Sequence, residues 1–136
     1  MAQPYQLAEL IAEQLSALEW PVLHVADLAG IQESAQVAPA FNIIPAGIQI
    51  ADDGQSTSVK ESVTVIAVAR FSNQRSGQGA RQLAGPMLAQ AAELLTGWKP
   101  TTGHTALAIE SPPLPQFSSG FGYYPLQFSS NYDLTE

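Results

Sequence analysis

The sequence contains no cysteine, so disulfide bonds, thiolate metal sites and thiol nucleophiles are excluded. Charged residues are also scarce, because they make up 12% of the 136 residues, about half of the share usual for a globular domain. No apolar run approaches the roughly 18 to 20 residues that cross a membrane, and Met1–Tyr5 lacks the basic residues of a signal peptide. We expect a single domain over residues 1–136 and no association with membranes.

The few charges are unevenly distributed along the chain. Residues 1–59 contain seven acidic residues and no Lys or Arg, whereas all five basic residues lie between Lys60 and Lys99. A surface so poor in charge is expected where other subunits cover it, or on a monomer with an unusually neutral surface. The asymmetry allows the acidic part of one copy to face the basic part of the next, as in a head-to-tail ring. The alternatives are pairing within one subunit and simple solvation. Candidates for charged contacts between subunits are Glu9, Glu13, Arg70 and Arg81.

Two segments have the apolar periodicity of amphipathic helices, residues 5–18 and residues 80–96. Gly97 follows the second segment and suits the left-handed position that ends many helices. In the first helix the residues expected to face the core are Leu7, Leu10, Ile11, Leu15 and Leu18. In the second helix they are Leu83, Met87, Leu88, Ala91, Leu94 and Leu95.

Five segments favour β-strands, namely residues 22–25, 41–50, 58–71, 105–110 and about 122–134. Pro45 predicts an edge strand or a bulge, and Asp52-Asp53-Gly54 predicts a hairpin turn. Ile66 and Val68 make both faces of the third strand apolar, so we expect its middle to be covered on both sides. A proline-rich stretch at 111–115 cannot pair in a sheet. Residues 27–40 could hold a helical turn or two. The expected fold is α+β, with a mostly antiparallel four- to five-stranded sheet and two main helices packed on one face.

No motif in the sequence points to catalysis, a cofactor or a metal ion. His24 and His104 lie in predicted strands without further ligands at zinc spacing, so we expect strand-edge or surface histidines. The glycine-rich stretch Ser76–Arg81 lacks the Lys-Ser/Thr pair of a phosphate-binding loop and the third glycine of a dinucleotide motif. A calcium loop starting at Asp52 would need an acid where Val63 stands. A pI near 4.6 argues against gripping nucleic acid, although an acidic protein can surround DNA without holding it.

From Pro39 onward the sequence resembles the phage tail terminator family, the tail-completion proteins of long-tailed bacteriophages. The resemblance rests on Pro39–Pro45, on Val65–Arg70, on Ala106–Ser111 and on the last strand from Tyr124 to Tyr132. The strongest part of the resemblance is Leu94-Leu95-Thr96-Gly97-Trp98-Lys99-Pro100, in which Gly97, Trp98 and Pro100 form the fold signature.

The resemblance implies a structural, non-enzymatic virion protein without a cofactor, assembled in the host cytoplasm and located at the junction of tail and neck. Six copies would form a ring that caps the tail tube, stops its polymerisation and offers an attachment surface for the neck or head connector. Its partners would be the tube protein, the connector and the sheath protein of a contractile tail, and DNA would pass through the lumen. Candidate contacts between stacked rings are Asp52, Asp53, Gly54, Gln55, Asn73, Gln74 and Arg75.

Two alternatives remain at the level of sequence. One is another connector subunit of the virion, such as a head-completion or neck protein. The other is a small ligand-binding or enzymatic domain that forms a pocket from Tyr123, Tyr124 and Trp98.

Overall fold

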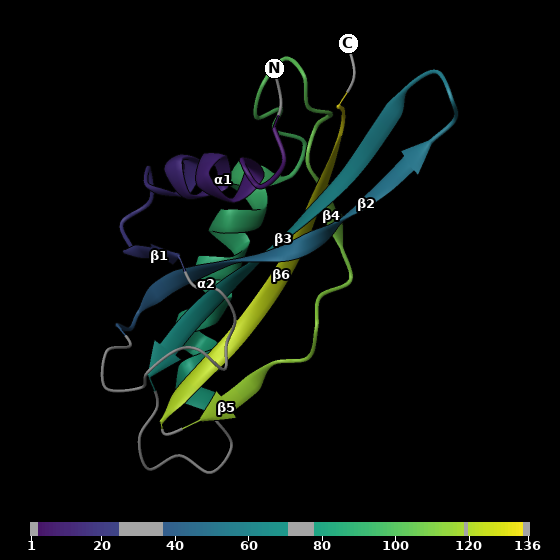
Figure 1. Ribbon diagram of the computed structural model, residues 1–136. Coiled ribbons are helices and arrows are strands. Elements are labelled where there is room, and N and C mark those ends of the chain that lie inside the picture. Colours follow the sequence, from purple (N-terminus) through teal and green to yellow (C-terminus); the bar gives the residue numbers. More distant parts are fainter. Residues whose placement is uncertain (1–2, 25–36, 71–77, 119, 135–136) are drawn as a thin grey trace.

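The computed structural model describes residues 3–24, 37–70, 78–118 and 120–134. The described chain forms an α+β fold in which one open sheet carries two helices on one face (Figure 1). The elements are α1 (Leu7–Leu15), β1 (Val22–His24), β2 (Ala40–Asp52), β3 (Thr57–Arg70), α2 (Gln78–Leu95), β4 (Ala108–Glu110), β5 (Gln116–Ser118) and β6 (Phe121–Asp133).

Within the described residues the sheet has six strands, which corrects the expected four to five. It is mixed and mostly antiparallel, with one parallel pair. The strand order is β1-β2-β3-β6-β4, and β5 pairs separately with β6. The β1–β2 pair is parallel, whereas the other pairs are antiparallel. A parallel neighbour needs a connection of a dozen or more residues, and residues 25–39 supply that length between β1 and β2. The three-residue β5 is too short to show alternation, which explains why the sequence did not reveal it.

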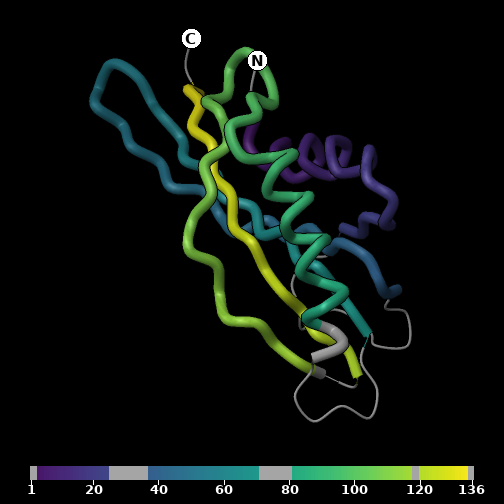
Figure 2. The backbone as a smooth tube through the Cα atoms, turned by 180° about the vertical axis from the view of Figure 1, so that it is seen from behind, coloured from purple at the N-terminus to yellow at the C-terminus, as the bar shows by residue number. Residues whose placement is uncertain are grey.

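The main core lies between the sheet and the two helices. The helices begin and end close to their predicted limits, and Figure 2 shows α2 lying across the sheet with α1 beside it. Leu83 was predicted to face this core, but its side chain is 51% exposed. The α2 stripe that packs on the sheet passes instead through Ala84, Met87, Ala91 and Leu95, a set with equally good helical spacing. The small Ala84 and Ala91 let α2 lie close to the strands.

The middle of β3 is buried on both sides, as predicted. Val63, Val65 and Ala67 belong to the main core under the helices, while Ile66 and Val68 are buried in a second cluster on the opposite face, here called the open face. Alternation along the strand places successive side chains on opposite faces. The open face, which carries neither α1 nor α2, therefore also holds buried apolar side chains.

A bulge interrupts β2 next to Pro45, where the sequence predicted an edge strand or a bulge. The register between β2 and β3 shifts between Pro45 and Gly47, so that Ile48 lies opposite Glu61 and Ile50 opposite Val59. One extra residue in a strand moves every later side chain to the other face. Because of this shift, Ile48 and Ile50 lie on the helix side of the sheet, although regular alternation from Ile44 would place them on the open face.

The hairpin of β2 and β3 extends past the bulge and away from the helices (Figures 1 and 2). We call residues 47–62 the arm. On its β3 side, β6 pairs along the arm as far as Ser58, which lies opposite Asp133. On its β2 side, β1 pairs only with residues 41–43, and no other strand of the described chain continues along that edge.

Candidate functional site

The tip of the arm is a tight polar turn that projects into solvent. The Asp52 carboxyl accepts a hydrogen bond from the Gly54 N–H at 2.9 Å, and the Asp53 carboxyl accepts from Gln55 N–H at 2.9 Å and from Ser56 N–H at 2.8 Å. Gly54 has a φ of 87°, a conformation that glycine adopts without steric cost. The hydrogen bonds from Ser56 and Gln55 lower the pKa of Asp53, so the tip carries negative charge at neutral pH. The predicted turn is confirmed, and all four of its candidate contact residues, Asp52 to Gln55, are exposed.

The helix side of the arm is apolar but only partly covered. Val59 and Tyr132 form a small buried cluster, against which Ile48 and Leu134 pack. Ile50, the next residue outward on this face, is 59% exposed. The part of the arm beyond the bulge extends away from α1 and α2 (Figure 2), in agreement with the exposure of Ile50.

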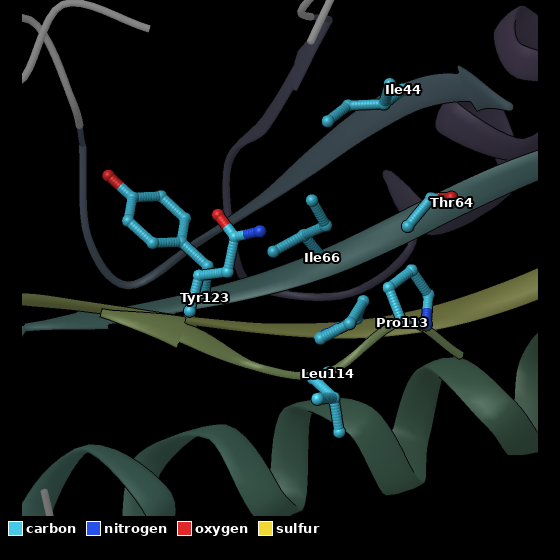
Figure 3. Close-up of a pocket in the computed structure, with 8 residues that line it drawn as sticks. Ile44, Thr64, Ile66, Pro113, Leu114 and Tyr123 are labelled. Carbon is cyan, nitrogen blue, oxygen red and sulfur yellow. The ribbon is translucent and has the colours of Figure 1, made fainter. Parts of the chain in front are cut away.

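The open face holds an apolar groove of about 180 Å³. In Figure 3, Ile44, Ile66 and Tyr123 extend from β2, β3 and β6, while Pro113 and Leu114 border the same space from the segment after β4. Leu114 is 85% exposed, an unusual exposure for a leucine that borders an apolar groove. The complete lining is Ile44, Thr64, Ile66, Pro113, Leu114, Gln116, Tyr123 and Pro125.

Two basic residues lie on the open face, at either end of the groove. Lys60 forms an ion pair with Glu110 at 2.6 Å, and this contact lowers the pKa of the Glu110 carboxyl. The Lys60 charge is thus paired within the subunit, one of the alternatives considered for the charge asymmetry. Arg70, at the end of β3, lies over the Phe121 ring with its guanidinium carbon 4.9 Å from the ring centroid. Among the described residues, no carboxylate lies within ion-pair distance of Arg70.

A buried polar cluster anchors the base of the arm to the rest of the domain. Glu61 is 1% exposed, and its carboxyl accepts a hydrogen bond from the Tyr132 hydroxyl at 2.8 Å and one from the Tyr5 N–H at 3.2 Å. Burial, followed by the hydrogen bond to Glu61, raises the pKa of Tyr132, so the phenol stays protonated and donates. Although Glu61 belongs to β3, its carboxyl lies close to the N-terminal end of α1, where the helix dipole favours a negative group. The cluster thus joins β3, β6 and the entry to α1.

His104 is buried, which corrects the prediction of a surface or strand-edge histidine. It lies in the loop before β4, is 1% exposed, and stacks edge-on against Tyr132 with ring centroids 5.2 Å apart. Its Nδ1 lies 2.7 Å from the Thr101 hydroxyl, while Nε2 has no hydrogen-bond partner among the described residues. Burial lowers the pKa of His104. His24, in contrast, is exposed on the edge strand β1, as predicted.

We expect His104 to make the stability of the domain depend on pH. Because its pKa is lowered in the folded state, the unfolded chain binds a proton more readily below an unfolded pKa of about 6.5. The free energy of unfolding should therefore fall as the pH drops from about 6.5 through the folded pKa. Urea unfolding at pH 7.5 and 5.5 should show a larger loss for the wild type than for His104→Gln, which cannot titrate. Equal losses would contradict the assignment.

The remaining predicted residues lie in separate parts of the molecule. Glu9 and Glu13 are exposed on the outer side of α1, and Arg81 is exposed near the start of α2. Asn73, Gln74 and Arg75 lie outside the described residues. After α2, Gly97 has a φ of 80°, its N–H donates to the Leu107 carbonyl, and the half-buried Trp98 packs on the main core. Pro100 is partly buried in the following loop.

The structure does not assemble the pocket expected for the ligand-binding alternative. Tyr124 and Trp98 belong to the helix side of the sheet, whereas Tyr123 lines the groove on the open face. Among the described residues, no group of three or more His, Cys, Asp or Glu side chains could hold a metal ion. No helix within these residues is long and apolar enough to cross a membrane.

Sequence reasoning missed the groove and the exposed Ile50. Both features depend on which face of the sheet a side chain occupies. The groove residues Ile44, Ile66 and Tyr123 come from three strands that are distant in sequence, and the bulge decides which side Ile50 occupies. The one local signal was Pro45-Ala46-Gly47, where the proline predicted an edge strand or a bulge but not the face that Ile50 occupies. Glu61 was treated as one charge among several, although it is fully buried.

A comparison with curated protein sequences found no match. A comparison with models of protein families, in contrast, matched residues 1–136 to the model described as phage tail terminator protein. The match covers the whole chain, including the first 38 residues, which precede the stretches that carried the resemblance. The chain therefore belongs to the phage tail terminator family.

Proposed function

We propose that six copies of this protein form a ring at the end of the tail tube, stop its polymerisation and present an attachment surface to the neck or head connector. The observation that carries the proposal is the arm, whose ordered and exposed acidic tip stands clear of the helices. A projecting turn held by its own side chains is suited to touching a neighbouring ring. Within the described residues, the side-chain hydrogen bonds of Asp52 and Asp53 stay inside the turn.

Membership of a family of structural virion proteins, not known for enzymatic activity, supports this role over a catalytic one. The charge of the chain fits a ring through which DNA slides, because a net charge of −7 repels the phosphate backbone. The low charge content fits burial of much of the surface between subunits. The partners in this proposal are the tube protein, the connector and, in a contractile tail, the sheath protein, with the ring formed in the host cytoplasm before it joins the virion.

The proposal is tested by electron microscopy of particles made without this protein. We expect headless tails with tubes of excessive and variable length, because polymerisation has no terminator. Supplying the wild-type protein in trans should restore tails of uniform length. Headless tails of normal length would instead place the protein at the neck, as another connector subunit.

A head-completion role is distinguished by where the protein is found. A tail terminator should co-purify with tails from particles that cannot assemble heads. A head-completion protein should remain with heads when tails are absent. The family match favours the first outcome.

A further inference from the structure

Among the described residues, two sites on opposite sides of the sheet combine apolar side chains with exposure, namely Ile50 and the groove bordered by Leu114. Ile50 is exposed on the helix side of the arm. The groove lies on the open face near the start of β6, whereas the arm pairs with the end of β6. A contact in which one copy uses only its arm and the next copy uses only its groove is heterologous. Repetition of such a contact produces a head-to-tail ring or filament.

The groove is large enough to hold the exposed side chain of Ile50. A protein cavity of about 150 Å³ accommodates benzene, a six-carbon ring. The groove measures about 180 Å³ and has a mostly aliphatic and aromatic lining, so it can take the four-carbon side chain of one isoleucine. Burying that side chain would also shield Leu114, which borders the groove and is 85% exposed.

The charges beside each surface are complementary and similarly spaced. On the arm, Asp52 and Asp53 follow Ile50 by two and three residues, about 7–10 Å along a strand. Beside the groove, Arg70 lies four residues beyond Ile66 on the same face of β3, about 13 Å away. The Arg70 side chain is long enough to bridge the few ångströms by which the two spacings differ. The other open-face base, Lys60, is already paired with Glu110.

We propose that Ile50 of one copy inserts into the groove of the next copy, with the acidic tip of the arm directed toward Arg70 of that copy. This inference rests on the proposed ring and names the contact that closes it. The bulge at Pro45–Gly47 is the feature that turns Ile50 to the required side. The contact buries a neutral surface and pairs an exposed acid with an exposed base across the interface.

Because the chain has no cysteine, disulfide trapping can test the contact directly. The variant Ile50→Cys/Gln116→Cys places one thiol on the arm and one in the groove lining. Within one subunit these positions are separated by about nine residues along β6, roughly 30 Å, which is too far for a disulfide. Under a mild oxidant we expect a ladder of covalent multimers that ends at the number of copies in the ring. The matched control, Ile50→Cys/Leu83→Cys, moves the second thiol to the exposed side of α2 and should give no ladder.

Native mass spectrometry of the uncrosslinked protein distinguishes failure of the arm contact from failure of the proposed ring. Wild-type rings without a ladder would overturn the arm contact and leave the ring intact. Covalent dimers alone would show a two-fold contact and overturn the head-to-tail arrangement. A wild type that stays monomeric over the accessible concentration range and on purified tails would overturn the ring and the arm contact together.

A charge placed in the contact provides a second measurement. Ile50→Asp should raise the protein concentration needed for ring formation at least tenfold, because a carboxylate loses its hydration in a groove whose lining is mostly apolar and includes no Lys or Arg. Leu83→Asp introduces the same charge at a similarly exposed leucine on α2 and should leave ring formation unchanged. Rings that form equally well with Ile50→Asp would contradict the proposal, provided that the circular dichroism spectrum shows a folded protein.

Discussion

Replacing the arm tip, Asp52–Gln55, by a Gly-Ser linker of equal length is expected to give a folded protein that still forms rings through Ile50, more weakly because the contact with Arg70 is lost, but that no longer limits tail length. The tip is exposed and makes only local hydrogen bonds, so its loss removes little from the core. If the tip contacts the tube or the connector, tails carrying the variant should be overlong, and the titre of infectious particles should collapse. Electron microscopy of the particles measures tail length directly.

A matched variant separates the shape of the tip from its charge. In Asp52→Asn/Asp53→Asn, the side-chain oxygens still accept the three backbone hydrogen bonds of the turn, but two negative charges are lost. With rings shown to be intact by native mass spectrometry, overlong tails with this variant would assign the contact between rings to charge, whereas normal tails would assign it to the shape of the turn. Tails of normal length with the Gly-Ser linker would contradict a role of the tip in contacts between rings. The other loop predicted to touch neighbouring rings, Asn73–Gly79, can be exchanged in the same way.

Glu61→Ala is expected to cost the largest share of stability among the substitutions considered. It leaves the buried Tyr132 hydroxyl and the Tyr5 N–H without their acceptor and removes buried methylene groups, for a combined loss of about 2–4 kcal/mol. Because a domain of this size has a total stability of only about 5–15 kcal/mol, such a loss is severe. Urea unfolding followed by circular dichroism at neutral pH measures the effect.

Glu61→Gln tests whether the hydrogen bonds, and not merely the filled volume, are responsible. Glutamine retains the side-chain oxygen that accepts from Tyr132 and Tyr5, so we expect a loss of about 1 kcal/mol or less. Glu9→Ala, at an exposed site on α1, should change the free energy of unfolding by no more than about 0.5 kcal/mol. An equal loss for the Ala and Gln variants of Glu61 would show that the cluster acts only by packing.

The two predictions differ in how far apart in the sequence their contacts lie. The turn at Asp52–Gly54 could be predicted because its hydrogen bonds are local. The burial of Glu61 could not, because its partners Tyr5 and Tyr132 lie 56 and 71 residues away. For the same reason His104, placed against Tyr132 by a loop, was mistaken for a surface residue. Leu83 illustrates a different failure, since two stripes on α2 satisfied the helical period and only packing against β3 and β6 selected one of them.

The sequence by itself determined the positions of both helices, of the long strands β2, β3 and β6 and of the hairpin turn, and it restricted Pro45 to an edge strand or a bulge. These features follow from the period of apolar residues and from the backbone preferences of proline, glycine and aspartate, which act over a few residues. Only the tertiary structure decided that β1 joins the sheet in parallel, that β5 pairs with β6, and that the groove and Ile50 lie on opposite sides of the sheet. Strand pairing and register across the sheet set these outcomes, because a shift of a single residue exchanges the two faces of a strand.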